Sequence, residues 1–272
     1  MKLFSSPIYS YVSRNRRSKV AKALVRFSNL VRRAYFNSSN HDIRTNGEAL
    51  VLKRCYDACM KENGPFVFFD VGANVGDWTT VALEICQPCQ AHLFEIVPET
   101  RLLLEKAHGD RRNVTINKCG LSNCSQSIKI RFYPSASTGS SEYALPWGVD
   151  HVMIDADCMR GDDYMQQSGL SRVHFLKIDV EGGDYKVLQG FERSLSEGKI
   201  DFVQFEYNKA AVLSRIFLRD FYELLEGFGY VIGPILPNGA EFKKYDLFHD
   251  ESLLQSNFLA ARKTYESLFN DI

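Results

Sequence analysis

The stretch Phe66-Val-Phe-Phe-Asp-Val-Gly-Ala-Asn-Val-Gly76 joins an apolar run to a turn that contains two glycines. The run Phe66 to Asp70 is short and almost wholly apolar, which is typical of a strand that is buried on both faces. Gly72 and Gly76 permit a tight turn and let a ligand approach bare backbone, and a helix is predicted from about 77 to 85. A buried strand, a glycine turn and a helix N-terminus predict the first unit of a nucleotide-binding α/β domain.

Short apolar runs alternate with amphipathic stretches through the rest of the chain. Strands are predicted at 91–95, 114–117, 173–179, 201–206, 230–236 and 257–261, and a half-exposed antiparallel strand at 127–133. Helices are predicted at 48–61, from 98 onward, at 184–195 and around 217–228. This alternation indicates an α/β fold with a doubly wound, mostly parallel sheet and helices on both of its faces.

Charge is distributed unevenly along the 272 residues. Residues 1–41 contain nine basic residues and no acid, and since the chain has 33 basic and 33 acidic residues, the remainder carries a net charge of −9. The zero net charge of the whole chain gives no reason to expect a nucleic-acid partner. No apolar run reaches the length of a membrane-spanning helix. We therefore expect a separate basic segment at 1–41 and a single globular domain at 42–272.

The basic segment contains a predicted amphipathic helix between Lys19 and Tyr35. Its apolar face consists of Val20, Leu24, Phe27, Val31 and Tyr35, and its basic face carries Lys22, Arg26 and Arg33. Three hypotheses fit this pattern: residues 1–36 dock on an anionic membrane face, they pack on the domain as a lid, or they form an organellar presequence. The first two are favoured.

The seven cysteines are an odd number, and no secretory apolar region precedes them. Reduced thiols and a cytoplasmic location, with peripheral contact at the membrane, are the expectation. An alternative joins Cys55, Cys59, Cys86 and Cys89 in a zinc site, but the chain has only one CxxC pair.

Glu95 ends the second predicted strand, 23 residues after Gly72. An acid at this place in nucleotide-binding domains accepts hydrogen bonds from ribose hydroxyls. The dinucleotide pattern G-x-G-x-x-G fails at Asn74 and Asp77, whereas the shorter G-x-G-x-G pattern of methyltransferases fails only at Asn74. The turn and the acid therefore predict a nucleoside cofactor. The acid does not separate NAD from S-adenosylmethionine, whereas the glycine spacing disfavours NAD.

Two later stretches place carboxylates at the ends of neighbouring strands. They are Phe175-Leu-Lys-Ile-Asp-Val-Glu-Gly182 and Val203-Gln-Phe-Glu-Tyr-Asn208. Open α/β sheets bind their ligands at the carboxyl edge. A charged residue at the end of a buried strand is costly unless it has a charged or hydrogen-bonding partner or a functional role. Asp179, Glu181 and Glu206 are thus the predicted catalytic residues.

At these motifs the sequence resembles the FkbM family of S-adenosylmethionine-dependent methyltransferases. The resemblance covers roughly 67–261 and rests on Phe69-Asp-Val-Gly-Ala-Asn-Val-Gly-Asp77, Phe94-Glu-Ile-Val-Pro98, the stretch 175–182 with Leu188, and Gln204-Phe-Glu-Tyr-Asn208. It implies a Rossmann-like class I methyltransferase fold with a last antiparallel strand, and O-methylation of hydroxyls on sugars or natural products. One departure is that Gly183-Asp184 stand where the family often has histidine or alanine and then glutamate.

The predicted site therefore has a cofactor side and a chemical side. S-adenosylmethionine is expected to bind at Asp70, Gly72, Asn74, Gly76, Glu95 and Asp179. One of the three catalytic carboxylates would take the proton of the acceptor hydroxyl. Alternatively, Mg²⁺ or another divalent cation held by Asp179, Glu206 and Asn208 would lower the pKa of that hydroxyl. A purely structural interpretation has Glu181 capping the next helix and Glu206 paired with a lysine or arginine.

The acceptor is expected to be a small molecule or a glycan, and the stretch from Pro134 to Pro146 is predicted to cover its site. Two other functions remain open from the sequence. One is an NAD-linked oxidoreductase. The other is a catalytically idle Rossmann-like partner of glycan-assembly enzymes.

Overall fold

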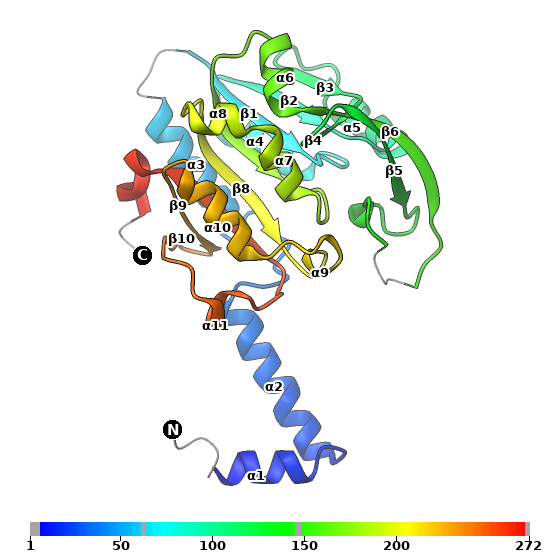
Figure 1. Ribbon diagram of the computed structural model, residues 1–272, viewed down its shortest axis with the longest axis vertical. Helices are drawn as coiled ribbons and strands as arrows, with labels where there is room; N and C mark the ends of the chain where they lie inside the picture. Colours follow the sequence, from blue (N-terminus) through cyan, green and yellow to red (C-terminus); the bar gives the residue numbers. More distant parts are fainter. Residues whose placement is uncertain (1–5, 61–63, 145–147, 270–272) are drawn as a thin grey trace.

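The computed structural model describes residues 6–60, 64–144 and 148–269 (Figure 1). Its centre is an eight-stranded sheet in the order β10-β9-β11-β8-β7-β1-β2-β3. Five neighbouring strands are parallel: β3 (Val114–Asn117), β2 (Cys89–Phe94), β1 (Phe66–Val71), β7 (Val173–Ile178) and β8 (Ile200–Tyr207). The last strand, β11 (Ser256–Arg262), inserts antiparallel between β8 and β9 (Tyr230–Leu236), and the short β10 (Gly239–Ala240) pairs with β9 at the edge. This order confirms the class I methyltransferase fold with its antiparallel strand.

Helices cover both faces of this sheet. The helices α3 (Glu48–Cys59) and α4 (Asp77–Ile85), and the 3₁₀ helix η3 (Lys263–Phe269), pack on one face together with Phe66 and Phe68 of β1. On the other face, α6 (Gly161–Gln167), α7 (Asp184–Gly190), α8 (Glu192–Ser196) and α10 (Leu218–Gly227) pack against Val67, Phe69 and Val71. Alternate residues of β1 thus contribute to two cores, as the pleat of a doubly covered strand requires. The helix α5 (Pro98–His108) contributes Leu104 to the first core.

The predicted helix over 184–195 is wrong in one respect, because it is broken at Phe191. A Cβ added at Gly190 would lie 2.2 Å from the carbonyl oxygen of Ser122, so the chain passes close to a neighbouring segment there. The carboxylate of Asp162 accepts hydrogen bonds from the backbone N–H groups of Arg193 (3.0 Å) and Ser194 (2.9 Å). A side chain from α6 therefore caps the N-terminus of α8, which local sequence does not reveal.

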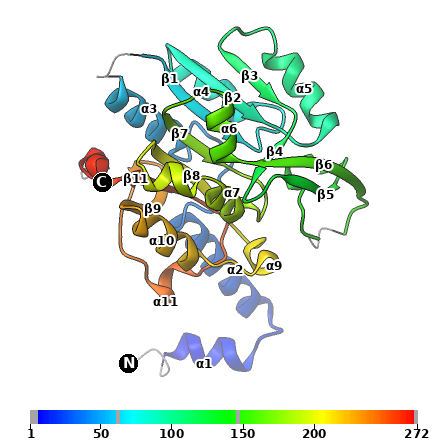
Figure 2. The same ribbon diagram turned by 45° about the horizontal axis from the view of Figure 1, so that its top comes forward.

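A second, three-stranded sheet stands beside the main one (Figure 2). The predicted antiparallel strand is β5 (Gln126–Phe132), which pairs with β6 (Val152–Arg160), and β6 also pairs in parallel with β4 (Gly120–Ser122). The sequence analysis did not include β4 and β6. The 3₁₀ helix η2 (Ser137–Gly139) lies between β5 and β6, and the short helices α9 (Ala211–Ser214) and α11 (Leu247–Asp250) follow β8 and β10.

The N-terminal helices α1 (Pro7–Arg14) and α2 (Lys19–Tyr35) project from the domain (Figure 1). The hydroxyl of Ser18 caps α2 by accepting a hydrogen bond from the N–H of Ala21 at 3.1 Å. The chain joins the domain directly after α2, because the amide of Asn37 donates to the carbonyl of Ile235 at 3.1 Å. The lid hypothesis is wrong, since the apolar face of α2 is exposed. None of the helices in the described part of the chain combines the length and apolarity that crossing a membrane requires.

Candidate active site

The turn between β1 and α4 is held by close contacts within the protein. Gly72 has a φ of 84°, and a Cβ at this position would lie 2.0 Å from the carbonyl oxygen of Asp179. Gly76 has a φ of 92°, and its Cβ would lie 2.6 Å from the ring of His108. A side chain at either glycine would therefore meet protein atoms, but the backbone of Gly72 still borders both of the cavities that meet at the carboxyl edge of the sheet, whereas Gly76 borders neither. Their absent side chains let the ends of β1 and β7 meet and let α4 pack on α5.

Glu95 follows β2 and ties that turn to the next segment. One carboxylate oxygen accepts the N–H of Asn74 at 2.9 Å, and the other accepts the N–H of Val97 at 2.7 Å. Burial raises the pKa of Glu95 above its ordinary value. The predicted acid is thus at the glycine turn, with its carboxylate at the carboxyl edge of the sheet.

Asp70 lies beneath the turn and borders neither of the two cavities that meet at this edge. It is fully buried, and its two oxygens accept the hydroxyl of Thr79 at 2.7 Å and the Nζ of Lys177 at 3.0 Å. The Nζ of Lys177 also lies 3.6 Å from Asp179. Burial opposes the charge of Lys177, but Asp70 and Asp179 outweigh it and raise the pKa of that lysine. The predicted cofactor contact of Asp70 is therefore replaced by a supporting ion pair.

The three predicted catalytic carboxylates come together at the ends of β7 and β8. One oxygen from each of Asp179, Glu181 and Glu206 lies within 4.8 Å of the others. Burial and then the charge of Asp179 raise the pKa of Glu181 to about 8. Burial, followed by the charges of Asp179 and Glu181, raises the pKa of Glu206 well above its ordinary value. Because ionising all three carboxylates at this separation is costly, Glu181 and Glu206 favour their protonated forms more than free carboxyls do.

The structure gives Asn208 a different role from that of a metal ligand. Its amide nitrogen donates to Glu181 at 3.1 Å and to Glu206, and its carbonyl oxygen accepts the N–H of Ala210 at 2.7 Å. Asn208 therefore positions two of the carboxylates through its amide nitrogen, and its carbonyl oxygen already accepts one hydrogen bond. The group of candidate metal ligands contains Glu181 together with Asp179 and Glu206.

Neither structural alternative for the glutamates fits their contacts. The following turn is capped by Asp184, whose carboxylate accepts the N–H of Gly182 at 3.2 Å and whose pKa rises to about 7 through burial and then the charge of Asp179. The second oxygen of Glu206 accepts the amide of Gln255 at 2.7 Å. The contacts of Glu206 are thus with amides and not with a lysine or arginine.

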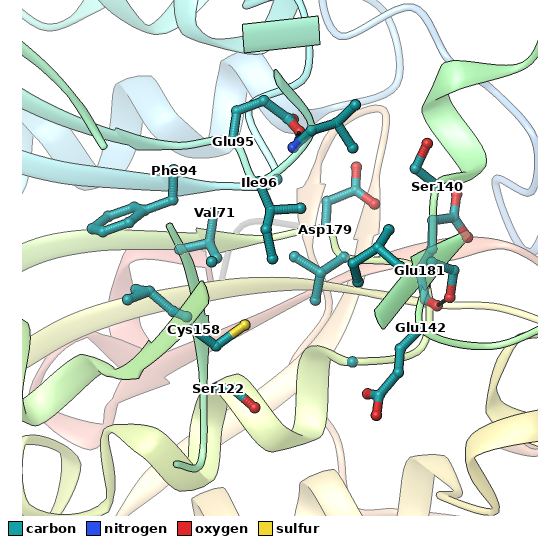
Figure 3. Close-up of a pocket in the computed structure, with 18 of the residues that line it drawn as sticks. Val71, Phe94, Glu95, Ile96, Ser122, Ser140, Glu142, Cys158, Asp179 and Glu181 are labelled. Atoms are coloured by element: carbon teal, nitrogen blue, oxygen red, sulfur yellow. Dashed lines mark hydrogen bonds between the residues drawn. The ribbon is translucent and has the colours of Figure 1, made fainter. Parts of the chain in front are cut away.

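The first cavity, of about 770 Å³, runs from the glycine turn to the small sheet (Figure 3). Figure 3 shows Glu95 and Asp179 on one side of it and Cys158 and Ser122 on the other. Its apolar lining comes from Val71, Phe94, Ile96, Val97, Leu121, Ile128, Ile130 and Val180. The segment 138–142, part of the stretch predicted to cover the acceptor, contributes to the lining of this cavity, and residues 145–146 of that stretch lie outside the described residues.

The second cavity, of about 1350 Å³, opens on the other side of the carboxylates. Gly72, Asn74, Thr138, Asp179 and Glu181 border both cavities, and Glu206 borders the second. Amide, hydroxyl and imidazole side chains dominate its outer wall: Asn37, Ser39, Asn40, His41, Asn46, Gln255, Ser256 and Asn257. The carboxylate group therefore lies where an apolar cavity meets a polar one.

The sequence analysis missed two charged residues of this site. Lys177 lies inside a quoted motif, and a lysine in the middle of an apolar strand was a sign that it needed a buried anion. Glu48 borders the second cavity, and its carboxylate accepts the amides of Asn46, Asn257 and Gln204. Burial raises the pKa of Glu48. Because two of its three partners come from distant segments, the local sequence does not mark Glu48 as part of the site.

The family model of the methyltransferase FkbM domain matches residues 70–232, which include the glycine turn, Glu95 and all three carboxylates.

The chain belongs to the FkbM methyltransferase family.

Relatives of this FkbM methyltransferase include Methyltransferase 1 of Beauveria bassiana, with 25% identity over 53% of this chain and 65% of the relative, so that the alignment spans slightly less than two thirds of that protein. The 2-O-methyltransferase NoeI of Sinorhizobium fredii is 23% identical over 73% of this chain and 86% of its own length. Among solved structures, the plantazolicin methyltransferase BpumL in complex with SAH aligns over 96% of this chain and 93% of its own, with 10% identity and a TM-score of 0.41.

Family membership excludes one of the two other functions that the sequence left open. The domain is an S-adenosylmethionine-dependent methyltransferase domain, and the NAD-linked oxidoreductase hypothesis is wrong. The zinc hypothesis also fails: within the described residues, the one group of histidine, cysteine or carboxylate side chains close enough to hold a metal ion is Asp179, Glu181 and Glu206.

Proposed function

We propose that this FkbM methyltransferase transfers a methyl group from S-adenosylmethionine to a hydroxyl of a sugar, glycan or related natural product. The observation that carries the proposal is the carboxylate group at the junction of the two cavities, since a hydroxyl acceptor needs both a methyl donor on one side and a proton acceptor beside it. The name of the 2-O-methyltransferase relative supports oxygen as the acceptor atom.

We assign the first cavity to the cofactor. Glu95 would accept hydrogen bonds from the ribose hydroxyls, because its carboxylate retains lone pairs beyond the two that the backbone uses. The apolar side chains of Phe94, Ile96 and Leu121 suit an adenine ring. When bound, S-adenosylmethionine supplies an electrophilic methyl group on a sulfonium, and negative charge on Asp179 would favour that cation.

We assign the second cavity to the acceptor. Its wall of amide and hydroxyl side chains can donate and accept hydrogen bonds at many positions, as recognition of a molecule rich in hydroxyls requires. A site built to hydrogen-bond hydroxyl groups discriminates strongly against analogues that lack them. This polarity favours a sugar over an apolar acceptor.

Asp179 is the proposed general base. It borders both cavities, and its side chain is 39% exposed, so an acceptor hydroxyl can reach it. As the acceptor oxygen bonds to the methyl carbon, the carbon–sulfur bond breaks and the hydroxyl proton passes to the carboxylate. Protonated Glu181 would then donate a hydrogen bond to a neighbouring oxygen of the acceptor, because its pKa is raised to about 8.

A divalent cation is the second candidate, favoured by the three carboxylate oxygens within 4.8 Å. Asp179, Glu181 and Glu206 would hold it, and it would lower the pKa of the acceptor hydroxyl. The Nζ of Lys177, 3.6 Å from Asp179, already supplies positive charge there, and the amide N–H₂ of Asn208 faces two of the ligands. Both features favour the base over the cation.

The proposal is tested by transfer of labelled methyl from S-adenosylmethionine to extracted polysaccharides and glycolipids, with free sugars as a second panel. Label in a hydroxyl-bearing product, lost in Asp179→Asn, is the expected result. Label on nitrogen or carbon would overturn the assignment to oxygen. Cofactor binding without transfer to any acceptor would favour the idle partner of glycan-assembly enzymes.

A further inference from the structure

We propose that α1 and α2 form a docking surface for an anionic membrane. The face of α2 that the sequence predicts as apolar is exposed along its length, and Phe27 is 65% exposed. Six large apolar side chains form this apolar stripe: Val20, Leu24, Phe27, Leu30, Val31 and Tyr35. A stripe of this size on a projecting helix needs an apolar partner.

Positive charge borders the apolar stripe. At 100° per residue, Lys19, Lys22, Arg26 and Arg33 lie along one side of it, and Arg32 lies beyond the other. Among the described residues, no ion pair involves a basic side chain of α2, and the first acid of the sequence is Asp42. An apolar stripe with unneutralised cations beside it is the pattern of a helix that lies in the headgroup region of anionic lipid.

The packing of α1 leaves the apolar stripe open. Val12 of α1 lines a crevice with Ala21 and Val25 of α2, and Ala21 is buried there. On the helical wheel Val25 lies roughly 140° from the centre of the stripe, and Ala21 lies just past the edge that Tyr35 forms. Figure 1 shows the two helices projecting from the domain, and Figure 2 shows α1 apart from it. The contact between α1 and α2 thus fixes the turn between the helices and presents the stripe outward; Met1–Ser5 lie outside the described residues.

Charge also favours lipid over a second copy of the chain. Two copies that met through this stripe would bring their lysines and arginines together, with no acid in residues 1–41 to pair with them. An anionic lipid surface satisfies the apolar stripe and its basic border at once.

Docking would also place the acceptor cavity near the membrane. The chain runs from α2 directly into the segment 37–48, which borders the second cavity. The 17 residues of α2 span about 25 Å along the helix axis. This length limits the distance between the second cavity and the lipid headgroups. From this position we expect an acceptor that is attached to a lipid. This expectation rests on the proposed function, whereas docking itself does not.

The test is co-sedimentation of the full chain with vesicles of phosphatidylcholine alone or mixed with phosphatidylglycerol. We expect binding to the mixed vesicles that weakens as salt is added. Phe27→Glu should reduce partitioning at least tenfold, and Arg26→Gln by about fivefold, the effect of one surface cation. The matched controls are Leu103→Glu, a 55% exposed leucine on α5, and Lys129→Gln on β5; neither should change binding.

Circular dichroism and cofactor affinity should be the same in all four variants, because the substituted side chains are exposed. Equal binding to neutral and mixed vesicles, or loss of binding in Leu103→Glu as large as in Phe27→Glu, would overturn the proposal. Absence of vesicle binding, with dimers in analytical ultracentrifugation that Phe27→Glu abolishes, would overturn it in favour of self-association.

Discussion

Replacing Lys177 by methionine should destabilise the whole domain. Asp70 is fully buried and Lys177 nearly so, and their charged groups lie 3.0 Å apart between β1 and β7. The substitution leaves Asp70 with only the hydroxyl of Thr79, and an uncompensated buried carboxylate costs about 3–5 kcal/mol. For a domain of this size, each kcal/mol lowers Tm by roughly 2–4 °C, so we expect a loss on the order of 10 °C.

Urea denaturation and calorimetry measure this effect, and two further variants test its cause. Removing both charges in Asp70→Asn/Lys177→Met should restore most of the lost free energy of unfolding, because no buried charge then remains. Lys129→Met, which breaks an exposed ion pair with Asp155, should cost less than about 1 kcal/mol. A double variant as unstable as Lys177→Met, or a single variant no worse than Lys129→Met, would refute the reasoning.

Three predictions concern the site itself. Asp179→Asn should lower kcat by roughly 10²–10⁴-fold while cofactor affinity by calorimetry changes little, and an equal loss in both would contradict its role as base. A chelator should leave the rate unchanged; rate loss restored by Mg²⁺ or Mn²⁺, with Glu206→Gln comparably damaged, would establish the cation instead. Because the folded pKa of Glu181 is raised from 4.5 to about 8, the folded state binds the extra proton, so stability should fall as pH rises through that window. Unfolding curves of Glu181→Gln should show a shallower fall, and an unchanged slope would argue against a buried, protonated carboxyl.

Much of the fold followed from local pattern. Each buried strand is a short apolar run, and apolar residues recur at helical spacing in α2, α4 and α10. The carboxylate group followed from topology alone, since Asp179 and Glu206 close two neighbouring parallel strands and must meet at the same edge. These features depend on residues close together in the chain, or on the polarity of the strands.

Other features depend on contacts between distant segments. The break at Phe191 comes from a carboxylate on α6, and the outer wall of the polar second cavity is assembled from residues of 37–48 and 255–257. Asn208 carries a side-chain oxygen that could ligate a metal, yet its amide nitrogen faces the two glutamates and its oxygen accepts the N–H of Ala210. The sequence determined the sheet, the glycine turn and the acids at the carboxyl edge of the sheet. Short stretches of sequence suffice for these features, because they contain the hydropathy period and the direction of each strand. How far each acid is buried and which of them border both cavities were decided only by tertiary structure, because burial and neighbouring charge, which raise the pKa of Glu181 and Glu206, depend on how distant segments pack.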